Sequence, residues 1–149
     1  MKKTLSVVVL LLAFLVTETL LSFIISSVYI IAGYGVFNTG KILRGINEYA
    51  MLGILRLMFY FVFSIGIFFV LDRELNLKNR VAQLMIINCS MYMFISLLYG
   101  LIFIPDTKDY FAKAFFYIII LSTIISPVIL YKIPFFRKLA DDTHKVAIR

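Results

Sequence analysis

Four long apolar runs limit what this 149-residue chain can fold into more than any other feature. They cover residues 5–31, 50–71, 81–104 and 110–131. Each meets or exceeds the roughly 20 residues that a helix needs to cross a hydrocarbon core about 30 Å thick. Backbone groups in lipid have no water to bond, so each run must be helical. The sequence therefore predicts an all-α polytopic membrane protein, a four-transmembrane-helix antiparallel bundle.

The composition agrees with this prediction. Hydrophobic residues make up 62% of the chain and charged residues only 15%, whereas soluble domains are nearer half apolar and a quarter charged. The net charge of +7 comes from lysines and arginines that lie mostly at the ends of the apolar runs. At such positions basic residues are topology signals, so we expect no nucleic-acid partner.

The distribution of these basic residues sets the expected orientation. Ten lie on one side of the predicted bundle: Lys2, Lys3, Arg73, Lys78, Arg80, Lys132, Arg137, Lys138, Lys145 and Arg149. Three lie on the other side: Lys41, Arg44 and Lys108. The positive-inside rule then puts both termini in the cytoplasm. The first run is far longer than a signal-peptide core and is expected to remain as a span. The start of the chain and its short loops suit a multi-pass protein of the bacterial cytoplasmic membrane.

Residues 1–132 are expected to form the transmembrane domain and residues 133–149 a cytoplasmic interfacial tail. The first loop, 33–49, is the longest, and after residue 41 it is either a short interfacial helix or an ordinary loop. The loops 72–80 and 105–109 are tight, so the helices that they join are antiparallel neighbours.

The tail begins with a short apolar patch beside basic residues. The patch is Ile133, Pro134, Phe135 and Phe136, followed by Arg137 and Lys138. Aromatic and basic residues at a cytoplasmic span end are typical of contact with anionic headgroups. The alternative is a docking segment for a protein partner. The one histidine, His144, is expected to be solvated.

Two ionisable residues lie inside the first two runs. Glu18 is about 20 Å from the cytoplasmic face and Arg56 about 21 Å, if each residue adds 1.5 Å to a spanning helix. Ionisable residues within spans usually face the bundle interior and pair with one another. We therefore predict an ion pair between Glu18 and Arg56.

Polar side chains recur at three- or four-residue spacing and define an expected interior face in each run. The repeats are Glu18, Ser22, Ser26, Tyr29 and Gly33, then Arg56, Tyr60 and Ser64, then Asn88, Tyr92, Ser96 and Tyr99, then Ser122 and Ser126. One interpretation is hydrogen-bonded helix packing. The other is a polar path or ligand cavity lined by Glu18, Arg56, Tyr60, Asn88 and Tyr92. Pro127 is expected to kink the fourth helix because it cannot donate to the Thr123 carbonyl.

The chain has few residues that could catalyse a reaction or bind a metal ion. The only cysteine, Cys89, excludes an intrachain disulfide and a cysteine-based metal cluster. We expect no enzyme activity, no cofactor and no metal. A non-catalytic subunit or an assembly or accessory factor of a larger membrane complex fits best, with an integral membrane protein as partner. The alternative is a small channel or transporter with Glu18 at its ion or proton site, which would need a homo-oligomer to enclose a pathway. A lipid-handling protein is a third class.

Overall fold

The structure is a computed structural model that describes residues 2–34, 40, 63–102 and 110–147. Within these ranges it has five helices and no strand. They are α1 (Lys2–Tyr34), α3 (Ile65–Leu75), α4 (Arg80–Ile102), α5 (Tyr110–Lys132) and α6 (Pro134–Ala147). The predicted all-α class is confirmed for this part of the chain.

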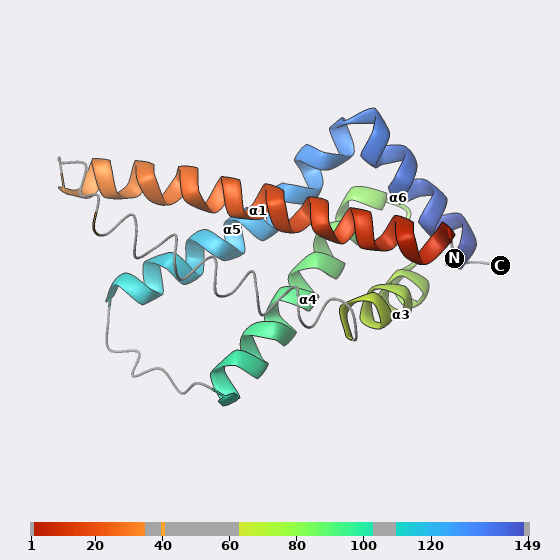
Figure 1. Ribbon diagram of the computed structural model, residues 1–149, viewed down its shortest axis with the longest axis horizontal. Helices are drawn as coiled ribbons and strands as arrows, with labels where there is room; N and C mark the ends of the chain where they lie inside the picture. Colours follow the sequence, from red (N-terminus) through yellow and green to blue (C-terminus); the bar gives the residue numbers. More distant parts are fainter. Residues whose placement is uncertain (1, 35–39, 41–62, 103–109, 148–149) are drawn as a thin grey trace.

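The helices pack so that both termini lie at the same end of the molecule. In Figure 1 the N-terminal end of α1, the short helix α3 and the C-terminal helix α6 gather at this end. The last turns of α1 and the first turns of α5 lie at the opposite end. Helix α1 packs along α5, and α5 packs along α4.

An apolar core lies near the end that carries the termini. All five helices contribute to it, and α1 supplies its largest share: Val7, Leu10, Leu11, Phe14, Leu15, Phe68, Leu84, Ile87, Met91, Leu130 and Ala140. The C-terminal helix is therefore part of the fold, since Ala140 belongs to this core.

The outer faces of the long helices are apolar, and buried polar residues continue the interior face beyond the apolar core. On α1 the exposed large side chains include Leu12, Val16 and Leu20, whereas Glu18 and Ser22 are buried. Helices α4 and α5 repeat the pattern: Gln83, Asn88, Ser122, Thr123 and Ser126 are buried, and Met93, Phe94, Leu97, Tyr117, Leu121 and Ile129 are exposed. A helix at the surface of a soluble protein has the opposite distribution.

By length and composition, one helical stretch among the described residues can cross a membrane, Thr4–Tyr29 of α1. A second is obtained if Tyr117–Lys132 and Pro134–Lys145, which meet at 101°, count as one span. One or two spans are therefore supported. Most of the run 50–71 lies outside the described residues, and the four-span bundle stays a prediction.

The loop predicted at residues 72–80 is shorter than expected. Helix α3 continues to Leu75 and α4 starts at Arg80, so only residues 76–79 connect them. Asn76 ends α3 in the left-handed conformation, with φ 33° and ψ 46°, which asparagine adopts more readily than most residues. Asn79 Oδ1 then accepts hydrogen bonds from the amides of Val81 at 3.1 Å and Ala82 at 3.3 Å. This is an N-cap, and it fixes the start of α4.

The tail forms a helix that turns back across the bundle. Helix α6 starts at Pro134, a residue favoured in the first helical position. The turn contains hydrogen bonds from the Ile133 amide to the Leu130 carbonyl and from the Arg137 amide to the Ile133 carbonyl, both at 3.0 Å. The predicted loops 33–49 and 105–109 lie almost wholly outside the described residues.

Candidate functional site

A buried polar cluster joins α1, α4 and α5, and we call Glu18, Asn88, Thr123 and Ser126 the central cluster. Asn88 Nδ2 donates to Glu18 Oε1 and, at 3.1 Å, to the Thr123 carbonyl. Ser126 Oγ donates to Glu18 Oε1 at 3.2 Å and lies 3.3 Å from Asn88 Nδ2. The cluster therefore links three helices through one side-chain amide and one carboxylate.

Pro127 explains why a backbone carbonyl takes part in this cluster. In a regular helix the Thr123 carbonyl would accept from the amide of residue 127, and proline has no N–H to donate. The Asn88 amide occupies that position from the neighbouring helix. An unpaired buried carbonyl is costly, so this contact compensates for the proline locally.

Glu18 accepts hydrogen bonds from its neighbours in the cluster. Glu18 is 3% exposed, and both groups named above donate to it, Asn88 through its amide and Ser126 through its hydroxyl. The neighbouring groups also fix the amide orientation of Asn88, because a carboxylate and a carbonyl accept hydrogen bonds and only the NH₂ side can donate. The cluster is a bonded junction between helices.

Among the predicted interior residues, the structure brings Glu18 and Asn88 into contact and buries Tyr92 one helical turn beyond Asn88. Arg56 and Tyr60 lie outside the described residues. The ion pair between Glu18 and Arg56 therefore stays a prediction. Helix α5 runs through Pro127 to Lys132, and the kink predicted at the proline stays a prediction as well.

Two of the remaining predicted polar residues, Ser26 and Ser122, are buried and bonded within their own helices. Ser26 donates to the Phe23 carbonyl at 3.0 Å and Ser122 to the Ile118 carbonyl at 2.8 Å. Such bonds let hydroxyl residues reside among apolar neighbours. Tyr29 was expected on the interior face and is exposed, as is Val28 before it. The side chains described beyond Ser27 on α1 are therefore exposed.

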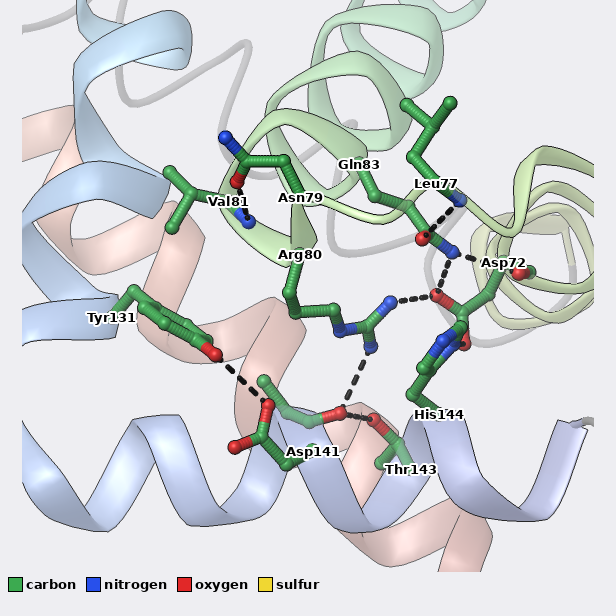
Figure 2. Close-up of polar contacts among 11 residues, drawn as sticks. Asp72, Leu77, Asn79, Arg80, Val81, Gln83, Tyr131, Asp141, Thr143 and His144 are labelled. Carbon is green, nitrogen blue, oxygen red and sulfur yellow. Dashed lines mark hydrogen bonds and ion pairs between the residues drawn. The ribbon is translucent and has the colours of Figure 1, made fainter.

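A second buried cluster lies at the end that carries the termini, and we call Asp72, Arg80, Gln83 and His144 the terminal cluster. Figure 2 shows these side chains converging from α3, α4 and α6. Arg80 forms an ion pair with Asp72 through Nη1 and donates from Nη2 to the Ala140 carbonyl at 2.9 Å. The start of α4 is thereby joined both to α3 and to the C-terminal helix.

Gln83 makes two further hydrogen bonds to Asp72. Its Nε2 donates to the Asp72 carbonyl at 2.8 Å and to Asp72 Oδ1 at 3.0 Å. Its Oε1 accepts from the Leu77 amide at 2.9 Å. Asp72 is 1% exposed and Arg80 is 9% exposed, so the ion pair is buried. Buried ion pairs persist when further hydrogen bonds satisfy them in this way.

His144 belongs to this cluster, and the expectation that it is solvated is wrong. Its side chain is 19% exposed, with Nδ1 3.4 Å from Asp72 Oδ2. One more contact holds this helix, from the Tyr131 hydroxyl on α5 to Asp141 Oδ1 at 3.1 Å, and within α6 Thr143 Oγ1 donates to the Ala140 carbonyl at 2.8 Å. The sequence signal for this cluster was a pair of opposite charges flanking a short turn.

Within the described ranges no group of three or more His, Cys, Asp or Glu side chains is placed to hold a metal ion. No protein-family model, curated protein or solved structure matches this chain. The two clusters and the exposed apolar helix faces are therefore the features that bear on function.

Proposed function

We propose that this chain is a four-span integral membrane protein, with both termini in the cytoplasm, that serves as a non-catalytic subunit or assembly factor of a larger membrane complex. The observation that carries the proposal is the pairing, on α1, of an exposed apolar face with the buried and hydrogen-bonded carboxyl group of Glu18.

Two features favour lipid as the surrounding solvent. The first is the outward row of Leu12, Val16 and Leu20, because contiguous apolar surface of this extent is unfavourable in water. The second is the central cluster, where polar side chains bond across helices, as an apolar surrounding requires. Helix α1 has 33 residues and is therefore about 50 Å long, so it must tilt or project beyond the bilayer.

The positions of the termini favour an even number of crossings. Both lie at one end of the molecule, beside α3 and α6 (Figure 1). The basic side chains of Lys138 and Lys145 on α6 are exposed at that end. By the positive-inside rule this end faces the cytoplasm.

A non-catalytic role is favoured by how the reactive groups are used. Glu18 accepts hydrogen bonds that hold helices together, and Asp72 is enclosed by Arg80 and Gln83. Groups bonded in this way serve packing, and a catalytic acid or base must instead reach a substrate. These contacts favour a role in interaction with other membrane proteins.

The test is purification of tagged chain from membranes in mild detergent, followed by mass spectrometry. We expect membrane proteins that co-purify in stoichiometric amounts and that are lost when Val16 and Leu20 are both changed to alanine. The matched control changes Met93 and Phe94, which are exposed on α4, to alanine. It should keep the co-purifying proteins. A chain that purifies alone contradicts the subunit role.

The alternative function is a small oligomeric channel or transporter, and one observation favours it. Glu18 is a buried carboxylate beside the hydroxyl of Ser126, an arrangement that ion and proton sites within membranes use. Flux through liposomes containing the purified chain, abolished by Glu18→Gln, would support transport. A homo-oligomer without flux would contradict it.

A further inference from the structure

We infer that the turn between α5 and α6 binds the phosphate headgroups of anionic phospholipids at the cytoplasmic face. We call Lys132, Ile133, Phe135, Arg137 and Lys138 the corner surface. The inference rests on the proposed membrane insertion and names a partner that the insertion alone does not require.

The orientation of the two helices places this surface at a membrane boundary. Helices α5 and α6 meet at 101°. If α5 crosses the bilayer, α6 then runs along its surface, and the turn lies where the chain leaves the hydrocarbon core. The corner surface is therefore at the depth of the headgroups.

The side chains of the corner surface combine both properties that an anionic bilayer surface attracts. Ile133 and Phe135 are exposed, and Phe135 is 63% exposed. Lys132, Arg137 and Lys138 are exposed beside them. Apolar side chains enter the acyl boundary, and each lysine or arginine near the surface adds electrostatic attraction to anionic lipid.

Two contacts hold the corner surface in place. The ring of Phe135 packs edge-on against Phe136, with centroids 5.1 Å apart, and Phe136 is partly buried against the core. The guanidinium carbon of Arg137 lies 5.5 Å from the centroid of the Tyr131 ring. The surface is therefore presented by a packed turn.

The positive charge is concentrated at this turn. Residues 132–138 contain three basic residues and no acidic one. The next turns are mixed in charge: Asp141 accepts from Tyr131, and exposed Asp142 lies between Lys138 and Lys145. Arg80, at the same end of the molecule, is turned inward to Asp72 and does not contribute.

The test measures lipid preference by native mass spectrometry. The purified full chain is titrated with dioleoylphosphatidylglycerol and with dioleoylphosphatidylcholine, and the ratio of the two dissociation constants is recorded. In the variant Lys132→Gln/Lys138→Gln, the preference for phosphatidylglycerol, measured by this ratio, should be about 25-fold weaker. Each basic residue contributes a factor of about five. Arg137 is left unchanged because it also contacts Tyr131.

Two matched variants make the result specific. Lys132→Arg/Lys138→Arg keeps the charges and should keep the preference. Arg73→Gln/Lys78→Gln removes two exposed charges from the same end of the molecule and should keep the preference within about twofold. Equal loss in this control and in the corner variant would overturn the inference, because the attraction would then be spread over the whole end.

The outcomes also separate this inference from the proposed membrane insertion. Alkaline carbonate washing of membranes tests insertion: a chain that is washed off contradicts the insertion, and the inference falls with it. A chain that stays in the membrane while the corner variant keeps its lipid preference overturns the inference alone. If the corner variant instead releases a co-purifying protein at unchanged lipid preference, the surface is a protein-docking site and the inference is wrong.

Discussion

The side-chain amide of Asn88 donates to the main-chain carbonyl of Thr123 at 3.1 Å, the carbonyl that Pro127 leaves without a main-chain donor in α5. The same amide reaches Glu18. One asparagine thus compensates for a proline in α5 and anchors a carboxylate on α1. Loss of these contacts should weaken the packing of α1, α4 and α5 together.

Replacing Asn88 with alanine should destabilise the chain. Hydrogen bonds between helices in bilayers contribute about 0.6–1.7 kcal/mol each, and the variant loses donors to Glu18 and to Thr123. We expect a loss of about 2–3 kcal/mol in a thermal or detergent unfolding experiment. Met93→Ala, at an exposed position on the same helix, is the control and should change stability by about 0.5 kcal/mol or less. Equal effects of the two variants would contradict the role of Asn88.

Pro127→Ala should make Asn88 less important. Alanine restores the N–H that can bond the Thr123 carbonyl within α5, so the Asn88 amide is no longer needed there. In a double-mutant cycle, Asn88→Ala should cost about 1 kcal/mol less in the Pro127→Ala background. Additive costs would mean that the carbonyl and the amide are energetically independent.

Removing one partner of the ion pair in the terminal cluster should lower the free energy of unfolding more than removing both charges. Arg80→Met leaves the Asp72 carboxylate buried without its cation, and we expect a loss of about 3–5 kcal/mol. The variant Asp72→Asn/Arg80→Met should lose less than Arg80→Met alone. Arg73→Met, on the exposed side of α3, serves as the control. The prediction fails if the double variant is the least stable of the three in denaturant unfolding.

The predicted contact between Glu18 and Arg56 can be tested in the same way. Glu18→Gln or Arg56→Gln alone would leave one charge in the interior, whereas the double variant leaves none. We expect each single variant to be less stable than the double variant in detergent unfolding. Stability that falls further in the double variant would place the two residues apart.

The central cluster was partly accessible from the sequence because Glu18 and Asn88 are polar residues in apolar runs. Spans turn such residues inward, and that rule selects the face of each helix. It does not select the partner, because the partner of Asn88 is partly a backbone carbonyl. Only Pro127 marks that carbonyl in the sequence, through the donor that it lacks.

The terminal cluster was not predicted, because its burial depends on a helix distant in sequence. Asp72 and Arg80 flank a short turn, where charges are usually solvated, and Arg80 was counted among the orienting basic residues. The return of α6 covers them and places His144 against Asp72. The helical spacing of Phe136, Leu139, Ala140 and Thr143 indicates the inner face of α6, but only the fold shows what it covers.

The account depends on α1 turning its exposed apolar face out of the bundle, toward lipid or a membrane partner, and its buried polar residues toward other helices. Spin labels at Val16 and Leu20, compared with a label at Ser22, in chain reconstituted into liposomes test this directly. The labels at Val16 and Leu20 should be accessible to oxygen and protected from a water-soluble nickel chelate, whereas the label at Ser22 should be protected from both. Access of the nickel chelate to Val16 and Leu20 would place that face in water and contradict the account.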